Sequence, residues 1–583
     1  MASLLALDVV RDCTRKVRFD SAPQRGIFLT ISLKAFGLLW LIVFAACGGG
    51  SASAPSCTEG QTCTPTTACH GGTISCASGA PVCVDSGVAP DGTACSSGGS
   101  CQTGVCRRTV SGAFQTTYWT DAGTKTTLKG LPTLVFGDPA ATPSAILVPD
   151  GSASGYTKLP LVLSGDQSFA VSGVPTGPYF LELDAISTAA AVCGEPLTIV
   201  HLFELTTSTP DLASVTAARP DVVTPQAFPT VSFDMSNLDP WGSRDRLFIA
   251  SSQARTSQLL LAFPPLHATS FTGTFDWFGG LPDASKNDAV FVYQRASTVT
   301  GNGSTVARAT KFKKLIDLTM LEGTTTSATV ALEAAPQTGT LGADLRTSQF
   351  AALAADVHPG ASLNSFSLSV LGVPHSLTYP DMPLLDFSSI FFLSGSLVSG
   401  ASAGDFDYGS LPYGQFFDPL WKDDRRTVYF FDVHDQTPSD TTLVPFFRSD
   451  EAVPASPAGP IVPVIGPPKV PRVNGADAFT ARTGVGLQPT ISWSAPSLGS
   501  ATSYVLDVVA DPSCDLSGQI VGLSAVIHGG TSFKVPPGIL KPGRPYKAFI
   551  TARQAPWDVL DAGPFRTGTP LHSAQLVTSV FMP

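Results

Sequence analysis

The sequence predicts a mainly β protein, with several β-sandwich domains in series behind a disulfide-rich segment. Glycine and proline number 54 and 48 among 583 residues, and they separate short runs of β-branched and aromatic residues. Charged residues make up only 14% of the chain. Eight of the twelve cysteines lie between Cys57 and Cys106. Many short strands between turn residues are typical of sandwiches rather than of alternating strands and helices.

The N-terminal residues predict an exported, lipid-anchored protein. The apolar run 35–46 follows Lys34 and ends in Ala45-Ala46, directly before Cys47 and three glycines. Twelve helical residues span about 18 Å, less than the ~30 Å core of a bilayer, so the run fits a secretory signal.

This arrangement resembles the lipobox of bacterial lipoproteins. The resemblance implies that 1–46 is a signal peptide, that Cys47 is lipidated and becomes the first mature residue, and that 47–56 is a Gly/Ser tether. The residue after the cysteine is Gly48 and not aspartate, which resembles lipoproteins that are sent to the outer membrane. We therefore expect an outer-membrane or cell-surface location. The alternative is an uncleaved membrane anchor at 27–46, in which Lys34 is the only charge.

Charge argues against nucleic acid as a partner. The net charge is −10, and the signal segment 1–46 holds six basic and three acidic side chains, so the exported part is more acidic still. The exported part has no block rich in lysine and arginine, which a nucleic-acid-binding surface requires.

The cysteine-rich segment, 57–106, has almost no large apolar residues, so covalent links must stabilise it. Four disulfides are expected, with 105 possible connectivities. The competing interpretation is zinc, but the segment has no C-x-x-C pair and His70 is the only histidine nearby. We therefore predict disulfides and no metal. The eight residues are Cys57, Cys63, Cys69, Cys76, Cys83, Cys95, Cys101 and Cys106.

The end of this segment, 92–106, resembles the disintegrin-like cysteine repeats of secreted proteins. The resemblance implies no catalytic activity. We interpret the whole segment as a stiff stalk, with a small adhesive module as the alternative.

A strand–turn–strand pattern recurs after the cysteines. Its clearest copy is 169–183, where alternating apolar residues surround a Val-Pro-Thr-Gly-Pro turn, and looser copies are 233–249, 275–293 and 533–550. Alternation places every second side chain on a buried face, and proline and glycine favour chain reversal. We expect each copy to carry the chain from one sheet of a sandwich to the other.

Two regions resemble known domain families. Segments 110–114, 145–148 and 169–183 are similar to the carboxypeptidase regulatory-like (transthyretin-like) domain over 107–205, which is non-catalytic. Segments 489–493, 503–509 and 540–546 are similar to fibronectin type III, an immunoglobulin-like sandwich, over 472–583. That resemblance implies that Trp493 is the core tryptophan and Tyr546 the tyrosine after the Leu-x-Pro-Gly turn. A proline-rich linker, 456–471, precedes it, and the chain order predicts this domain furthest from the anchor.

Residues 206–455 are predicted to be β-rich and to form one or two domains of unknown type. One short helix is expected at 344–358, with Asp344 as its N-cap. Phe350, Leu353, Ala354 and Val357 follow a helical period and predict an apolar stripe packed on a sheet.

A weak hydrolase motif occurs in the same region. Gly400-Ala-Ser402-Ala-Gly404 matches G-x-S-x-G, and Asp432 and His434 follow in hydrolase order. The motif needs a strand before it and a helix after it, and the residues after Gly404 do not favour a helix. We treat a hydrolase as an alternative only.

The segment 405–431 is a candidate ligand site, because nine of its residues are aromatic and aspartates lie among them. Aromatic faces stack on sugar rings, and carboxylates accept hydrogen bonds from hydroxyls or bind Ca²⁺. We favour the other interpretation, a sandwich core with aspartates in its turns, because aromatic side chains mostly serve packing. The candidate binding residues are Tyr408, Tyr413, Trp421, Asp405 and Asp407.

Together these patterns predict a surface-anchored, multi-domain lipoprotein with a structural or adhesive role, no catalysis and no cofactor. Its expected partners are the membrane, through Cys47, and an extracellular protein or polysaccharide. The alternatives are a carbohydrate-binding accessory protein and an exported hydrolase using 400–404.

Overall fold

The computed structural model describes residues 57–583 with internal gaps. The signal segment, Cys47, the tether, Ser402 and Trp421 lie outside the described residues. The gaps are 96–97, 121–122, 133–140, 153–154, 193–194, 228, 261–263, 278, 300–304, 337–338, 374–381, 384–391, 398–403, 414–415, 418–421, 435–440, 452–458, 511–519, 556–562 and 568–570.

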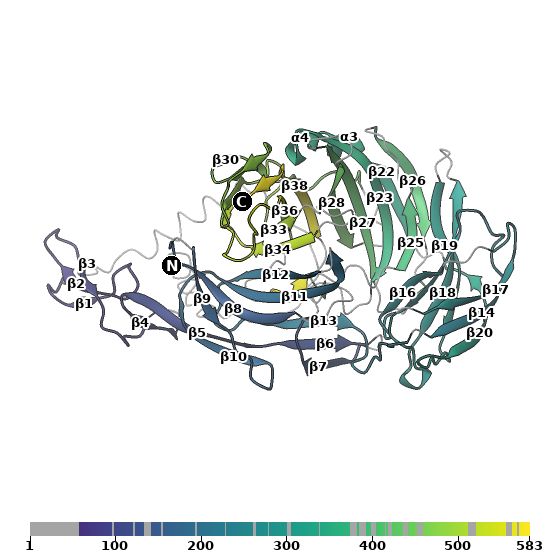
Figure 1. The fold of residues 1–583 in the computed structure, drawn as a ribbon, viewed down its shortest axis with the longest axis horizontal. Coiled ribbons are helices and arrows are strands. Elements are labelled where there is room, and N and C mark those ends of the chain that lie inside the picture. Colours follow the sequence, from purple (N-terminus) through teal and green to yellow (C-terminus); the bar gives the residue numbers. More distant parts are fainter. Residues whose placement is uncertain are drawn as a thin grey trace, which may run out of the picture. The chain divides into compact units, whose positions relative to one another are not determined.

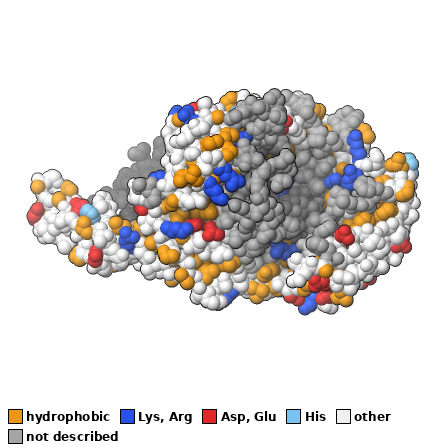
Figure 2. Space-filling model, in the orientation of Figure 1, with side chains coloured by type: hydrophobic (Ala, Val, Ile, Leu, Met, Phe, Trp, Pro, Cys, Tyr) orange, Lys and Arg blue, Asp and Glu red, His pale blue; other side chains and the backbone are white. Residues whose placement is uncertain are grey.

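The described chain forms two compact units. The first contains 57–66 and Gly71–Gly87, and the second contains Thr67–His70 and Val88–Pro583. The cysteine-rich segment is therefore shared between both units. The protein is mainly β, as predicted, with a disulfide-rich N-terminal part and little helix. Figure 2 shows charged side chains scattered among uncharged ones on one face, in keeping with the low charged fraction.

The first unit is a small sheet held by disulfides. Its strand order is β1-β2-β3. Among its described residues, only Gly72 is buried. Cross-links Cys57–Cys76 and Cys63–Cys83 join its strands and loops, as expected for a segment without an apolar core. The strands are β1 (Thr62–Cys63), β2 (His70–Ser75) and β3 (Val82–Val88).

The first sandwich of the second unit packs a three-stranded sheet on four strands of a large sheet (Figure 1). Phe169 and Val110 from one sheet share a core with Leu181 and Phe203 from the other. The small sheet contains β4 (Ser100–Gln102), β5 (Val105–Ala113) and β10 (Ser168–Pro175). The large-sheet strands are β8 (Thr142–Pro149), β9 (Tyr156–Pro160), β11 (Tyr179–Val192) and β12 (Glu195–Leu205).

The second sandwich lies within the region of unknown type. Its core includes Phe233, Trp241, Trp277 and Val292, all buried. Its small sheet contains β14 (Thr230–Ser236), β17 (Ser270–Asp276) and β20 (Thr325–Ala331). Its large-sheet strands are β15 (Arg246–Ser251), β16 (Thr256–Leu260), β18 (Val290–Val299) and β19 (Thr305–Leu315), and a 3-10 helix, η3 (Ala284–Lys286), precedes β18.

The third sandwich pairs a two-stranded sheet with another part of the large sheet. Leu345 and Phe366 belong to its core. The small sheet contains β22 (Gly339–Leu345) and β26 (Phe406–Tyr413). The large-sheet strands are β23 (Ala361–Val373), β25 (Phe392–Leu397), β27 (Lys422–His434) and β28 (Thr441–Glu451).

The predicted helix 344–358 forms as two short helices, α3 (Thr347–Ala351) and α4 (Ala354–Val357). The predicted stripe packs on the sheet, because Phe350 stacks on Tyr429 with ring centroids 3.6 Å apart and Val357 is buried. The prediction of Asp344 as N-cap is wrong. Asp344 belongs to β22, where its backbone pairs with Asp407 of β26. The strand therefore continues to Leu345, and the helix begins after Arg346.

The C-terminal sandwich buries Trp493, whose ring lies 5.4 Å from that of Tyr504. The hydroxyl of Tyr546 accepts a hydrogen bond from the Lys541 N–H at 2.9 Å, which ties the start of a strand to the preceding turn. The small sheet contains β29 (Lys469–Val473), β30 (Ala476–Asp477), β32 (Thr490–Ser494) and β35 (Ser532–Lys534). The large-sheet strands are β33 (Ser503–Ala510), β34 (Ile520–Ile527), β36 (Tyr546–Gln554) and β38 (Leu571–Val577).

The remaining strands are short or join sandwiches. One three-stranded sheet, β13-β6-β7, contributes Trp119 and Val215 to a core shared with Phe291 and Tyr293 of the second sandwich. These strands are β6 (Gln115–Trp119), β7 (Lys125–Lys129) and β13 (Ala213–Ala217). The others are β21 (Glu333–Ala334), β24 (Met382–Pro383), β31 (Arg482–Thr483), β37 (Arg566–Thr567) and β39 (Phe581–Met582).

The recurring strand–turn–strand units behave as predicted. In each of the four copies the first strand belongs to a small sheet and the second to the large sheet. In the clearest copy, β10 pairs with β5 and β11 pairs with β8 and β12. The other copies are β14 to β15, β17 to β18 and β35 to β36.

A continuous hydrogen-bonded ladder joins the four sandwiches in an order that differs from the chain order. The first sandwich pairs with the C-terminal one through parallel strands β12 and β34. The C-terminal sandwich then pairs with the third through β38 and β28, and the third with the second through β25 and β19. The C-terminal sandwich therefore lies beside the first, and not at the far end of a line as the chain order predicts.

Candidate functional site

Asp405, a predicted ligand residue, is bound within the protein. It lies directly before β26 and accepts hydrogen bonds from Ser348 N at 3.0 Å and Ser348 Oγ at 2.7 Å. Arg346 Nη1 lies 3.5 Å from the same carboxylate. These hydrogen bonds, chiefly that from the Ser348 side chain, lower the pKa of Asp405. The carboxylate thus satisfies an N–H of the first turn of α3, the role predicted for Asp344.

Asp407 and Tyr408 also have local structural contacts. Asp407 accepts a hydrogen bond from Gly409 N at 2.8 Å, and Gly409 has φ of 72°, so the carboxylate stabilises a bulge in β26. Tyr408 is half-buried and stacks beside Phe406, with centroids 6.1 Å apart, against the core of the third sandwich.

The rest of the aromatic segment contributes mainly to cores. Phe416 and Phe417 pack on Phe291 and Tyr293, and Tyr429 is fully buried. Tyr413 pairs with Gly339 through its backbone, but its side chain and Trp421 lie outside the described part. The described residues of 405–431 therefore favour the packing interpretation, and the structure does not bring them together around an open site.

The hydrolase motif lacks its structural context. Ser402 lies outside the described residues, and the segment that follows Gly404 forms strand β26 where the motif requires a helix. Asp432, the expected acid, accepts a hydrogen bond from Asn364 Nδ2 at 2.5 Å on the neighbouring strand β23. His434 donates its backbone N–H to Gly360 O at 3.3 Å.

An exposed polar surface lies on the second sandwich, which sequence reasoning missed. Three registered rows on the outward face of β17-β14-β20 carry only serine, threonine and aspartate, and we call these three rows the hydroxyl face. The fourth row is Ala331, Ser236 and Ser270. The opposite side chains of β14, Val231, Phe233 and Met235, are fully buried. The rows are Thr325, Thr230 and Asp276; Ser327, Ser232 and Thr274; and Thr329, Asp234 and Thr272.

The hydroxyl face is a regular array of short donors and acceptors. Adjacent strands lie about 4.8 Å apart, and alternate residues along a strand about 6.8 Å apart. Thr230 and Thr325 hydroxyls hydrogen-bond at 2.7 Å, and Thr272 Oγ1 donates to Asp234 Oδ1 at 2.9 Å. Serine, threonine or aspartate at every second position of 230–236 and 270–276, and at Thr325, Ser327 and Thr329, is the signal that predicts such a face.

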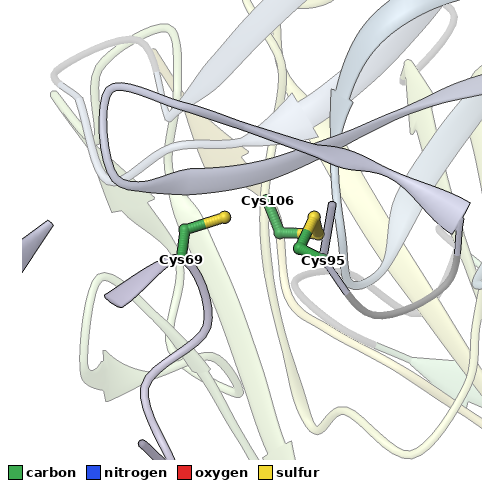
Figure 3. A group of neighbouring side chains, drawn as sticks. All are labelled: Cys69, Cys95 and Cys106. Carbon is green, nitrogen blue, oxygen red and sulfur yellow. A yellow bond between two sulfur atoms is a disulfide. The ribbon is translucent and has the colours of Figure 1, made fainter. Parts of the chain in front are cut away.

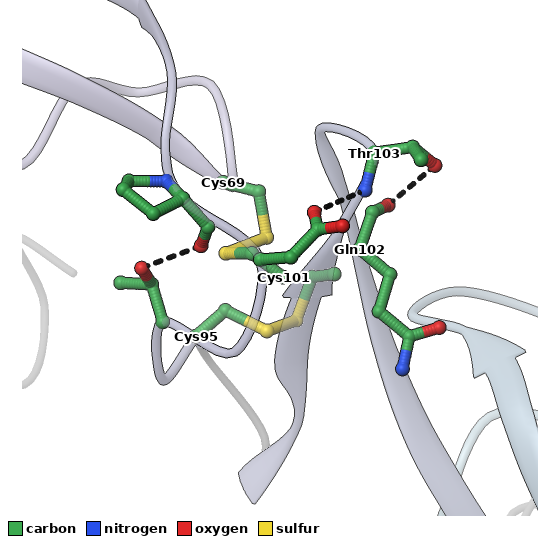
Figure 4. The surroundings of a disulfide bond; sticks show 9 residues. Cys69, Cys95, Cys101, Gln102 and Thr103 are labelled. Atoms are coloured by element: carbon green, nitrogen blue, oxygen red, sulfur yellow. Dashed lines mark hydrogen bonds between the residues drawn. A yellow bond between two sulfur atoms is a disulfide. The ribbon is translucent and has the colours of Figure 1, made fainter.

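The cysteines of the second unit form a compact sulfur cluster. The sulfurs of Cys69, Cys95 and Cys106 lie within 4.8 Å of one another, the geometry of a candidate metal site (Figure 3). Each is already oxidised, however, in the disulfides Cys69–Cys101 and Cys95–Cys106 (Figure 4). A disulfide sulfur is not a thiolate, so the cluster is not a metal ligand set.

The surroundings of these disulfides are turns fixed by hydrogen bonds. Thr103 N donates to Asp91 Oδ1 at 2.7 Å, and Thr103 Oγ1 donates to Gln102 O at 2.8 Å (Figure 4). Cys101 and Cys106 are almost fully buried. The eight cysteines predicted to form disulfides do so, in a connectivity that the sequence left open.

The predicted lipid attachment at Cys47 lies outside the described residues. Among the residues that the structure does describe, none belongs to a helix with the length and apolarity needed to span a bilayer.

Comparisons with known proteins identify no family. No family model matches the chain, and no curated protein matches it. Among solved structures, the Bacillus anthracis TIE protein is similar at 10% identity and a TM-score of 0.11, over 95% of this chain and 78% of that one. Escherichia coli alpha-2-macroglobulin activated by porcine elastase is similar at 8% identity and a TM-score of 0.12, over 82% of this chain and 43% of that one. These TM-scores carry no argument for a shared fold.

Proposed function

We propose that this protein is a surface-anchored lipoprotein with a structural or adhesive role, exported by its signal segment and held at the outer membrane or cell surface through Cys47. The observation that carries the proposal is the disulfide-linked N-terminal part. Disulfides persist in oxidising compartments and are rare in the cytosol. Four of them stabilise residues that otherwise have almost no apolar core.

The modules that follow support a binding or scaffold role without catalysis. The C-terminal sandwich has the strand order β30-β29-β32-β35 opposite β34-β33-β36-β38. Its buried Trp493 and the Tyr546–Lys541 hydrogen bond support the resemblance to fibronectin type III, a non-catalytic module. The polar groups Asp405, Asp407 and Asp432 all have structural hydrogen bonds.

The anchor is tested by replacing Cys47 with alanine in a bacterial host that has an outer membrane. The unaltered chain is expected in the membrane fraction, with acyl groups on an N-terminal peptide that starts at Cys47. The Cys47→Ala chain should lose the acyl groups and the cleavage at 46/47. Recovery of unmodified Cys47, or of a mature chain that retains Met1, contradicts the proposal.

A second candidate function, carbohydrate binding, is favoured by the hydroxyl face. Hydroxyls donate and accept hydrogen bonds, and the face has no lysine or arginine, so a neutral polysaccharide is its best-matched ligand. Replacing Thr272, Thr274 and Ser327 together by valine or alanine removes hydroxyls without disturbing the core.

A glycan array of the full chain tests this candidate. Binding at the hydroxyl face predicts at least a tenfold loss in the triple variant and no change in Trp421→Ala or Tyr413→Ala. The reverse pattern places the sugar site in 405–431. A chain that binds no glycan in either form removes this second candidate.

A further inference from the structure

An unprotected edge strand lies in the first unit. β3 is the last strand of the three-stranded sheet β1-β2-β3, and among the described strands it pairs only with β2. Its other edge has no described strand partner, and the Gly87 N–H donates to Asp85 Oδ1 at 2.8 Å. Such an edge is a template on which another extended strand can pair.

The side chains of β3 favour pairing. All seven of its residues are exposed, and Val82 and Val84 each keep 48% of their surface accessible. They alternate with Cys83, so both valines lie on the same face of the strand. Cys83 is bonded to Cys63, which fixes the strand to the sheet. Exposed β-branched residues on a rigid extended strand gain from a covering partner, because they lose water contact without losing much conformational freedom.

Strand β7 of the same chain is an edge strand whose lysine residues oppose pairing with another strand. β7 is one of the two edge strands of β13-β6-β7 and has Lys125 and Lys129 at its two ends. Lysine on an edge strand opposes pairing, because its charge must stay hydrated. β3 carries no lysine and no internal proline. Of these two edge strands, β7 has lysine at both ends, whereas the only charged residue of β3 is Asp85.

We propose that β3 is a homotypic interface, on which β3 of a second copy of this chain pairs in antiparallel orientation. Pairing centred on Cys83 sets Val82 of each copy against Val84 of the other, so two apolar pairs form by symmetry. In that register Asp85 lies opposite Pro81, and the two Asp85 carboxylates do not face each other. The apolar pattern is thus self-complementary in one register. The inference does not rest on the proposed membrane anchor.

The expected dimer is weak. One strand pair buries less surface than a stable protein–protein interface, so association should be transient. Disulfides that hold the strand in place reduce the ordering that binding requires, which favours association of even a small interface.

Sedimentation velocity of the full chain in a mild detergent, from about 1 to about 100 µM, tests the proposal. The unaltered chain is expected to sediment faster as concentration rises. Val84→Lys adds an edge charge and should weaken self-association at least tenfold. The matched control is Leu128→Lys, which changes a leucine of β7 with 43% exposure and should leave self-association unchanged.

Amide hydrogen exchange and intact mass complete the test. In the unaltered chain, the β3 amides should exchange more slowly at high concentration, and in Val84→Lys they should not. Intact mass checks that both variants keep four disulfides, which separates a lost interface from a misfolded unit. The proposal is overturned if sedimentation is independent of concentration, if Val84→Lys associates as strongly as the unaltered chain, or if Leu128→Lys weakens association equally.

Discussion

His201 and Asp507 lie in one row across three strands of the large sheet, on either side of Ser524. His201 pairs with Ser524 between β12 and β34, and Asp507 pairs with the same serine between β34 and β33. Burial lowers the pKa of His201 to about 4. Burial raises the pKa of Asp507 to about 6, opposed by a hydrogen bond from Ser524. The contact between the first and last sandwiches therefore contains two groups with oppositely directed shifts.

These shifts predict opposing effects of acid on stability. Between pH 4 and 6.5 the histidine is protonated in the unfolded state and neutral in the folded state. Acidification through this range therefore lowers the free energy of unfolding by about 3 kcal/mol through His201. Between pH 6 and 4 the Asp507 carboxyl is protonated in the folded state and ionised in the unfolded state. Acidification through this range therefore raises the free energy of unfolding by about 3 kcal/mol through Asp507. The two contributions largely cancel in the unaltered chain.

Single substitutions should separate the two contributions. Denaturation by urea from pH 7 to pH 4 is expected to show His201→Gln becoming more stable in acid and Asp507→Asn becoming less stable. Parallel pH profiles for both variants and the unaltered chain would show that neither group titrates as its burial implies.

The buried ion pair of the second sandwich predicts a large stability loss. Arg219 Nε donates to both oxygens of Asp288, at 3.1 and 2.9 Å, and Asp288 is fully buried. Removing one partner leaves the other charge buried, so Asp288→Asn should reduce the free energy of unfolding by about 3–5 kcal/mol. Calorimetry is the measurement.

The matched control is the exposed pair beside it. Lys286 Nζ lies 3.0 Å from Asp221 Oδ2, with both side chains about half exposed. Lys286→Ala should cost less than about 1 kcal/mol. An equal loss in the two variants would argue that the buried pair is no more important than the surface one.

The disulfides predict both a peptide map and an order of stabilities. Digestion without reduction should release the links Cys57–Cys76, Cys63–Cys83, Cys69–Cys101 and Cys95–Cys106. Cys69–Cys101 spans 32 residues and Cys95–Cys106 spans 11. Because a longer loop has more entropy to lose, replacing the first pair by serine should cost about 1 kcal/mol more than replacing the second. Any other set of linked peptides, or the opposite order, rejects this prediction.

Asp405 predicts a stability effect that depends on pH. Hydrogen bonds from Ser348 lower its pKa, so its contribution is complete above the ordinary carboxyl pKa and is lost as pH falls through the lowered value. Asp405→Asn should lower the melting temperature at pH 7, and the difference should shrink in strong acid. Glycan binding, if present, should not change. An unchanged melting temperature at pH 7 would remove the capping role assigned to Asp405.

Local patterns in the sequence predicted the elements that depend on neighbouring residues. Alternating residues in 169–183 predicted two strands and a change of sheet, and the spacing of Phe350 and Val357 predicted the apolar stripe. Both depend on periodicity within one element. The cysteine count and the scarcity of apolar residues predicted disulfides in the same way, from composition alone.

Features that depend on distant partners cannot be predicted from local patterns in the sequence. Asp344 looked like a cap because it precedes a helical pattern, yet its backbone pairs with Asp407, and Asp405 occupies the capping role from 57 residues away. The hydroxyl face became visible only when strand register aligned three segments. The partner of β12, which lies about 320 residues later in the chain, leaves no pattern in either strand.

The pairing of β12 with β34 also determines how long β12 lacks its partner strand during synthesis. A ribosome that adds about 5–20 residues per second completes β34 roughly 15–65 s after β12. Throughout that interval β12 is an open edge on an otherwise finished sandwich, exposed to mispairing with other chains. β28, whose partner β38 is one of the last strands to be made, has the same problem for less time. A chaperone that shields strand edges would therefore matter most to this protein while its C-terminal sandwich is still being synthesised.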